Sequence, residues 1–573
     1  MFNVRDEIPQ ITVSNIKQIL LNYGINTYEE SLNPSPLIHS HIIGIDGLCV
    51  THSGKGSSEE FSLASAYAEL IERLSNHMLG RSPFSDLFYY KDKDFIFFPD
   101  TYKRDILEIG NINKFLLDEL RNNFYLSDGR YPSNEDLINV WGKILNNELH
   151  MSPFYNVRED RIEELPYNII DTLCGPNGIA AGNTYEEAVV HCICEIIERY
   201  MFSQVIDNPF SFPEIPMEYI KKHSKNAYKM ISCIEQNKRY KVYTLDVSMN
   251  GKFPCCASIL IDRQTQKYKF KIGCHPIFTI ALERSLTEIM QRHGTIESTL
   301  CNQVEWNSFT EENTKSYQNK CSYFRNSLGS VSNILFKREK DFEFKEWVDQ
   351  ENYSTKFWAN KLINLCLDLF DNVYIRNNSW LGFPVIRMYI PKITEITVIP
   401  KGYNNEYEEE IFYILKELNY YAYHLTDEYK MSLLNKLITE DNVFVNFLSN
   451  KNYTIASLYY YFGDKEKSYE YLCKIVNPSE EIKIIKRDLE LELKKYSLDD
   501  RNILIKMFFP EYLYSFLLRW RNNSFLTVFN GVKDISYIEK PRIDVVNFTK
   551  KLKDKISNNI VNQFVFRELL KGE

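Results

Sequence analysis

The sequence has no apolar run long enough to cross a membrane, and its first residues, Met1 to Glu7, carry charges early and no apolar core segment. A membrane-spanning helix needs about 20 consecutive, mainly apolar residues. A secretory signal needs an apolar segment behind a basic start. We therefore expect a cytoplasmic protein without a membrane partner.

A basic charge excess is missing as well. The chain has 77 acidic residues against 68 Lys and Arg, which gives a formal net charge of -9. Such a chain has no overall positive field to attract nucleic acid. We expect no nucleic-acid partner.

At 573 residues the chain is also longer than one ordinary domain, so two or more hydrophobic cores are predicted.

Cys-x-x-Cys pairs are absent, and the twelve cysteines are scattered along the chain. Cys192 and Cys194 would point to opposite sides of a helix. This pattern is typical of reduced, mostly buried thiols in a cytoplasmic protein.

The stretch from Thr184 to Tyr200 has a helix-like pattern with one acidic and one apolar side. At about 3.6 residues per turn, its acidic stripe contains Glu187, His191, Glu195 and Glu198. An acidic stripe by itself is typical of a solvated helix face.

A second copy of the pattern argues against a merely solvated helix face. The run from Leu63 to Leu74 places Ser65, Glu69, Glu72 and Arg73 on one face. Two Glu-x-x-Glu-Arg segments thus align, with these pairs of equivalent residues: Glu69 and Glu195, Glu72 and Glu198, Arg73 and Arg199. A third candidate helix, residues 281–292, presents Arg284, Glu288 and Gln291 on one face.

Glycine-containing turns precede the first two helices. A hairpin is predicted at Asp46-Gly47, and the following loop, His52 to Ser58, holds Gly54, Lys55 and Gly56. It has the residues of a phosphate-binding loop without the Walker spacing, so a flexible strand-to-helix turn is the alternative. The turn 175–184 offers small residues and Thr184 as an N-cap, where a helix N-terminus can bind an anion.

If the glutamates converge on one cavity, their repulsion must be relieved by protons or by divalent cations. Carboxylate ligands without His or Cys favour Mg²⁺ over zinc or iron. The arginines and Lys55 would then meet phosphate charge, which indicates a metal-bridged nucleotide site. A glycosidase would need only two carboxylates and no cation, and it fits the five glutamates poorly.

At this point the motifs resemble the YcaO family of ATP-dependent enzymes. The resemblance runs from about residue 5 to residue 400. It is carried by these segments in order: Gly54-Lys-Gly56, Ala64-Ser-Ala-x-x-Glu-x-x-Glu-Arg73, Ala181-Gly-Asn-Thr-x-x-Glu-Ala188, Glu195-x-x-Glu-Arg199, Ala281-x-x-Arg-x-x-x-Glu-x-x-Gln291, Asn378-Ser-x-Leu-Gly-Phe-Pro-Val-Ile-Arg387 and Ile390-Pro-Lys-Ile-Thr-Glu-Ile396. Arg5 and Thr12 depart from the family pattern, where Lys and Ser are expected, and Ala180 stands where some members have Ser.

The resemblance implies ATP and Mg²⁺ as cofactors and assigns roles to residues. The implied Mg²⁺ ligands are Glu69, Glu72, Glu195, Glu198 and Glu288. The implied catalytic residues are Glu69, Glu195, Glu198, Arg284 and Glu288. The implied ATP-binding residues are Arg5, Thr12, Lys55, Ser65, Glu72, Arg73, Asn183, Glu187, Arg199, Arg284 and Gln291.

The resemblance also implies an activity. Family members activate the backbone amide of a peptide or protein by O-phosphorylation, and an azoline, a thioamide or an amidine results. The implied partners are ATP, a peptide or protein substrate, and an E1-like protein or a sulfur donor. Without the Pro-rich C-terminus of azoline-forming members, the chain resembles the stand-alone subgroup, which is linked to β-methylthiolation of a ribosomal protein. A role as auxiliary factor there, and a non-catalytic docking role, are the alternatives.

The expected architecture is a mixed α/β YcaO fold over residues 1–404, with an insertion at about 85–165, followed by an all-α domain over 405–573. The run 455–472 resembles a tetratricopeptide (TPR) helix pair, with Gly463 in its turn. A helical cap or a dimerisation domain is the alternative for this region, and we expect a homodimer.

Overall fold

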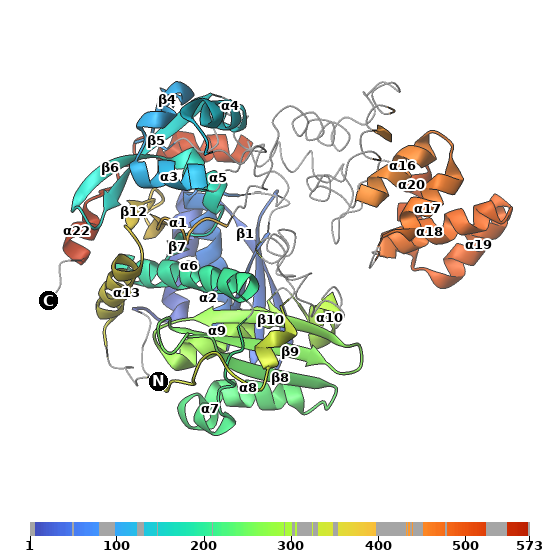
Figure 1. The fold of residues 1–573 in the computed structure, drawn as a ribbon, viewed down its shortest axis with the longest axis horizontal. Coiled ribbons are helices and arrows are strands. Elements are labelled where there is room, and N and C mark those ends of the chain that lie inside the picture. Colours follow the sequence, from blue (N-terminus) through green and yellow to red (C-terminus); the bar gives the residue numbers. More distant parts are fainter. Residues whose placement is uncertain are drawn as a thin grey trace. The chain divides into compact units, whose positions relative to one another are not determined.

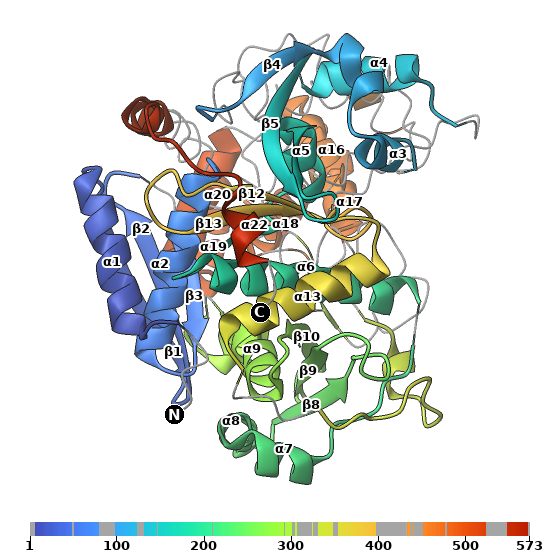
Figure 2. The same ribbon diagram turned by 90° about the vertical axis from the view of Figure 1, so that its left-hand side faces the viewer.

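The structure is a computed structural model of the chain. It describes residues 6–48, 51–79, 98–122, 131–145, 147–208, 210–291, 293–300, 304–305, 324, 331–347, 353–396, 431, 434–435, 438, 451–475, 478, 480–522 and 547–570. Arg5 lies outside these residues. The mixed α/β class is confirmed, with helices packed on antiparallel sheets and further helices in the C-terminal part (Figures 1 and 2).

The chain divides into two compact units. The first contains Met1–Tyr125, Gly129–Lys401 and Val545–Glu573, and the second contains Leu126–Asp128 and Gly402–Asp544. The expected boundary near residue 404 thus has a counterpart in the structure. The expectation that 405–573 forms one domain is wrong at its C-terminal end, because the last residues belong to the first unit.

The N-terminal part is a three-stranded antiparallel sheet covered by two helices. The sheet order is β1-β2-β3, and α2 packs on β3 and β2 while α1 packs on α2 (Figure 2). Gly47 adopts φ +80° in the hairpin between β2 and β3, as the Asp-Gly signal predicts. The elements are α1 (Pro9–Asn22), β1 (Thr27–Ser35), β2 (Ile38–Ile45), β3 (Thr51–Gly56) and α2 (Glu59–Ser75).

A second antiparallel sheet, in the order β11-β10-β9-β8, has helices on both faces. The long helix α6 (Tyr185–Asp207) lies over one face, and α8 and α9 cover the other (Figure 1). The elements are α7 (Met217–His223), α8 (Lys225–Glu235), β8 (Tyr240–Asp246), β9 (Cys255–Asp262), β10 (Lys267–Cys274), α9 (Phe278–Met290), α10 (Ile296–Leu300) and β11 (Val304–Glu305).

The third sheet includes strands of the segment at about 85–165, where the sequence predicts an insertion. Strand β5 from that segment pairs with β12 in the order β4-β5-β12-β13-β7, and β6 pairs with β5. The described part of the segment therefore belongs to the main fold. The elements are β4 (Tyr102–Asp105), η2 (Ile106–Asn111), α3 (Lys114–Asn122), α4 (Asn134–Ile144), β5 (Glu148–Asn156), β6 (Arg161–Pro166), α5 (Tyr167–Cys174), β7 (Ile179–Ala181), η4 (Asn333–Phe336), α13 (Thr355–Leu369), β12 (Tyr374–Asn377) and β13 (Val385–Tyr389).

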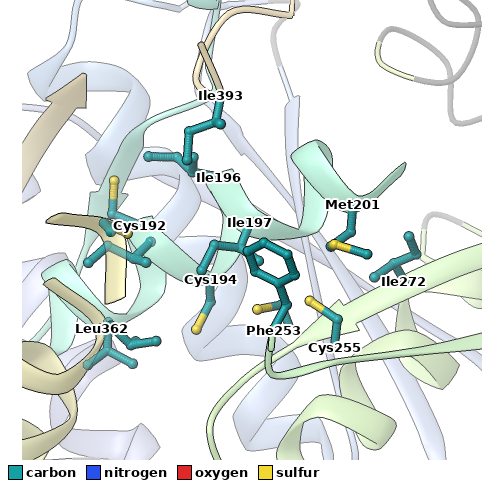
Figure 3. Packing of buried hydrophobic residues seen from close by; sticks show 14 of the residues in the cluster. Cys192, Cys194, Ile196, Ile197, Met201, Phe253, Cys255, Ile272, Leu362 and Ile393 are labelled. Atoms are coloured by element: carbon teal, nitrogen blue, oxygen red, sulfur yellow. The ribbon is translucent and has the colours of Figure 1, made fainter. Parts of the chain in front are cut away.

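Helix α6 is the centre of the main hydrophobic core. Its apolar side chains, among them Cys192, Ile196 and Met201, pack between the β8–β10 sheet and the strands β7 and β13 (Figure 3). The expected buried, reduced thiols are confirmed within the described residues: seven of the nine described cysteines are buried, and all nine are free. No described helix is long and apolar enough to span a membrane.

The C-terminal residues return to the first unit because they supply part of its core. Helix α22 (Val565–Leu569) buries Phe566, whose ring lies 5.8 Å from that of Tyr185 at the start of α6. Upstream, Gln563 accepts a hydrogen bond from the Asn377 N–H at 2.7 Å and donates one to the Asn377 carbonyl at 3.0 Å.

This arrangement makes a prediction. Phe566→Ala is expected to destabilise the first unit by about 3–5 kcal/mol, because it removes a fully buried aromatic ring. Hydrogen exchange of the α6 amides measures the effect. Phe564→Ala is the matched control, since Phe564 is 45 % exposed. Equal protection of α6 in both variants would contradict the docking of α22.

The described part of the second unit is helical, as expected. Gly463 lies in the turn between its first two helices with φ +84°, so the expected helix pair is present. Its TPR-like character stays a prediction. The helices are α16 (Lys451–Tyr461), α17 (Lys465–Cys473), α18 (Glu480–Leu493), α19 (Leu498–Phe508) and α20 (Glu511–Asn522).

Candidate functional site

The five predicted glutamates come from three strand–helix units with the same internal spacing. The units are β3–α2, β7–α6 and β10–α9. In each, the eleventh residue of the helix is a glutamate: Glu69, Glu195 and Glu288. Three residues later stand Glu72, Glu198 and Gln291, the last as the C-cap of α9. The two-copy repeat seen in the sequence is therefore a three-copy repeat in the structure.

Glycines hold each strand against its helix. A Cβ on Gly54 would lie 2.1 Å from the Ser62 carbonyl of α2, and one on Gly273 would lie 2.1 Å from the Ala281 carbonyl of α9. A Cβ on Gly182 would lie 2.4 Å from the backbone N of Ala188. The expectation of a phosphate-binding loop at 52–58 is corrected, because Thr51–Gly56 is strand β3. Its glycines bring two backbones together.

On α2, the two glutamates share one arginine. Arg73 lies 3.9 Å from Glu69 and 3.5 Å from Glu72, and His52 Nδ1 lies 3.7 Å from Glu69 Oε1. Burial raises the pKa of Glu72 well above its usual value, and the carboxylates of Glu195 and Glu69 raise it further against the opposing effect of Arg73. The glutamates of α2 and α6 are thus close enough to affect one another.

On α6, Glu195 accepts hydrogen bonds from Arg199 Nε and Nη2 at 3.2 and 3.1 Å. Arg284 of α9 faces the same carboxylates. Burial by itself would lower the Arg284 pKa, but Glu198 and Glu195 contribute to a net rise. The buried Arg284 Nε has no hydrogen-bond partner among the described residues. A buried donor of this kind can hold an anionic ligand.

Lys55 on β3 contacts residues of α9 and so joins the strand–helix pairs β3–α2 and β10–α9. Its ammonium forms an ion pair with Glu288 and donates to Gln291 Oε1 at 3.3 Å. Gln291 in turn donates to the Ser53 carbonyl at 2.8 Å. Burial lowers the pKa of Lys55 to about 8, with Glu198 opposing the shift.

Two lysines of β10 near Glu288 were not predicted from the sequence as site residues. Lys271 Nζ lies 3.7 Å from Glu288 Oε1, and Lys269 stands two residues earlier on β10. They are 3 % and 5 % exposed. Alternating Lys and apolar residues are ordinarily typical of a strand with one solvated face. Here β10 lies inside its sheet. The alternating pattern therefore indicates buried lysines only when both faces of the sheet are known to be covered.

A further group of predicted ATP-binding residues meets at the N-terminus of α6. Thr12 Oγ1 donates to Asn183 Oδ1 at 2.9 Å, and Asn183 donates through its backbone N–H and its side chain to Glu187 Oε2 at 3.0 and 2.9 Å. Thr184 caps the helix as predicted. Ser65 is half-buried on α2, one turn before Glu69. Arg5 lies outside the described residues.

The donor set suits a nucleotide with Mg²⁺. Within the part of the chain that the structure describes, no three His, Cys, Asp or Glu side chains are grouped to hold a metal ion by themselves. Mg²⁺ commonly takes only one or two protein carboxylates and completes its shell with water and phosphate oxygens. Carboxylates for the metal and neighbouring cations for phosphate are both present, and the unpartnered Arg284 Nε is consistent with an anion there.

Comparison with known proteins decides the family. The family described as "YcaO cyclodehydratase, ATP- and Mg2+-binding" matches residues 53–394, which is more than half of the chain. The chain belongs to the YcaO family. Its cofactors are therefore ATP and Mg²⁺, as the sequence predicts.

Two curated proteins are similar to this YcaO chain. The "Ribosomal protein S12 methylthiotransferase accessory factor YcaO" of Escherichia coli K12 is 27 % identical over 402 residues. An "Uncharacterized protein" of Haemophilus influenzae is 27 % identical over 406 residues. Each alignment covers 68 % of this chain and 66 % of the relative, so the matched part falls just short of two thirds of the relatives' length.

Solved structures show weaker similarity. A "Heterocyclase in complex with substrate and Cofactor" is 17 % identical, with a TM-score of 0.45 and coverage of 68 % of this chain and 53 % of that chain. YcaO from Methanopyrus kandleri bound with AMPPCP and Mg2+ is 13 % identical, with a TM-score of 0.40. The alignment covers 70 % of this chain and 95 % of that chain.

Proposed function

We propose that this YcaO protein is an ATP- and Mg²⁺-dependent enzyme that activates a backbone amide of a peptide or protein by O-phosphorylation. The observation that carries the proposal is the repeated strand–helix unit. It presents a glutamate at the same helix position three times and surrounds these glutamates with Lys55, Arg73, Arg199 and Arg284.

The proposed reaction has three steps. A nucleophile adds to the amide carbonyl carbon, and the carbonyl oxygen becomes an oxyanion. This oxygen attacks the terminal phosphorus of ATP, and ADP leaves. The bond between carbon and the phosphorylated oxygen then breaks while the amide nitrogen or the added group loses a proton and forms a double bond to the carbon. Phosphate departs, and the carbon keeps the nucleophile. The nucleophile decides whether an azoline, a thioamide or an amidine results.

The chain's own residues contribute position and charge. ATP with Mg²⁺ supplies the electrophilic phosphoryl group and neutralises phosphate charge. Glu69, Glu72, Glu195, Glu198 and Glu288 are the residues that would hold the metal. Arg73, Arg199 and Arg284, which pair with these glutamates or lie among them in this structure, would be released to phosphate oxygens. The Thr12–Asn183–Glu187 group would hold the nucleotide from the N-terminus of α6.

Two readouts test the proposal. The purified full chain is expected to bind ATP in the presence of Mg²⁺ and to lose binding when EDTA removes the metal. In host cells, deletion of the gene is expected to remove a peptide or protein modification, seen by mass spectrometry as loss of water or exchange of oxygen for sulfur or nitrogen. If the protein binds no nucleotide in the presence of Mg²⁺, the proposed enzymatic function is wrong.

A second candidate is an auxiliary role in β-methylthiolation of a ribosomal protein. The similarity to the accessory factor of Escherichia coli favours it. In this case, gene deletion lowers the methylthiolated fraction of the small-subunit ribosomal protein. An unchanged fraction, measured by mass spectrometry of purified ribosomes, would exclude the auxiliary role.

A further inference from the structure

The inner strand β10 carries two lysines on the face that meets α9. Phe270 and Ile272 belong to the core beneath α6, whereas Gly273 touches the α9 backbone. Because side chains alternate along a strand, Lys269 and Lys271 share the Gly273 face. Both are almost completely buried. Burial of an ammonium group is unfavourable unless an anion compensates it.

The carboxylates next to Lys55 and Lys271 are those of the candidate metal site, and Glu198 acts on both ammonium groups besides Glu288. Glu288 pairs through one oxygen with Lys55 and through the other with Lys271, at 3.7 Å in the second case. No ion pair or hydrogen bond joins Lys269 to any residue that the structure describes. Burial and the charge of Lys55 lower the pKa of Lys269 to about 8, and Lys271 is a second cationic neighbour. The three ammonium groups on β3 and β10 thus lie close enough to act on one another, and Glu288 is the carboxylate that pairs with both Lys55 and Lys271.

Binding of Mg²⁺ would add positive charge next to these ammonium groups. When Glu288 turns to the metal, Lys55 and Lys271 lose the carboxylate that they share. A tetrahedral phosphoryl group can compensate all three ammonium groups, since lysine binds phosphate oxygens as a point charge. The position next to Glu288 also places such a group beside the metal, where the terminal phosphate of a nucleotide commonly lies.

We propose that Lys269 and Lys271 of β10, with Lys55 of β3, form the subsite for the terminal phosphoryl group of ATP and for the phosphate that it becomes. This inference rests on the proposed function. It assigns the β10 lysines to the third phosphate, so that they distinguish ATP from ADP.

The test compares two nucleotides on the full chain. Lys269→Met keeps the apolar stem and removes the charge, and it breaks no described contact. In calorimetry with Mg²⁺, this variant is expected to bind a non-hydrolysable ATP analogue about tenfold more weakly or worse, as for loss of one charge-assisted contact. Affinity for ADP is expected to stay within about twofold, because the first two phosphates keep their contacts. Lys271→Met is the second variant, and hydrogen exchange of β10 shows whether it remains folded.

Lys267→Met, on the same face of β10 but half-buried at its end, is the control. It is expected to bind both nucleotides as the wild-type protein does. Inorganic phosphate with ADP and Mg²⁺ gives the second arm: the wild type binds it, and Lys269→Met binds it more weakly. Parallel losses for ADP and the ATP analogue, or no loss for either, would overturn the subsite. If the wild-type protein binds neither nucleotide, the proposed function fails instead.

Discussion

Glu288→Gln is expected to lower Mg²⁺-dependent ATP turnover by about 100-fold or more, a loss typical of removing one preorganised charge from an active site. In this structure the Glu288 carboxylate is bracketed by Lys55 and Lys271. Glutamine keeps the shape but cannot balance either ammonium, and its amide is a weaker ligand for Mg²⁺. Glu195→Gln is expected to have an effect of similar size, because Glu195 is the equivalent residue of α6.

Activity and metal dependence are measured together. The Mg²⁺ concentration for half-maximal turnover of any residual activity is expected to rise in both variants. Glu60→Gln is the matched control, since Glu60 is exposed in the first turn of α2 and outside the repeat position. Wild-type turnover and metal dependence in Glu288→Gln and Glu195→Gln would remove these glutamates from the site.

Gly54→Ala and Gly273→Ala are expected to destabilise the first unit by about 1–3 kcal/mol or more. The added methyl would lie 2.1 Å from a backbone carbonyl of α2 or α9. These atoms belong to helix backbones, which cannot rotate away as a flexible side chain can. Each strand must therefore move away from the helix that carries its glutamate.

Urea unfolding, followed by hydrogen exchange of α2 and α9, measures this effect. Gly294→Ala is the control, because the nearest atom to its added methyl lies 4.0 Å away on Leu32. A Gly54→Ala protein with unchanged stability and lost nucleotide binding would restore the interpretation of 52–58 as a phosphate-binding loop.

The helical glutamates were predictable because a helix repeats with about 3.6 residues per turn, so their shared face can be found from spacing alone. The same spacing identified Arg284, Glu288 and Gln291 as a third group. It did not align this group with the other two. The equivalence depends on the helix starts at Glu59, Tyr185 and Phe278, which become evident only from the backbone.

Strand β10 was not predicted, and with it Lys269 and Lys271 were missed. Its alternating pattern is the same for a solvated edge strand and for an inner strand with a buried charged face. The choice between these depends on what packs on the second face, which is α9. The place of the last residues was missed for a related reason: Phe566 on a short helix has no periodic signal, and its tertiary contacts, among them that with Tyr185, show where it belongs.

The sequence by itself determined the family, the cofactors and the glutamate faces, because these depend on residue types at local, periodic spacings. The tertiary structure decided which charges meet: Lys55 with Glu288 across two strand–helix units, Glu72 near Glu195 across two helices, and two buried lysines beside them. It also decided that Gly54 serves backbone packing. Such pairings join residues far apart in the chain, and their energies depend on burial, which no local pattern specifies.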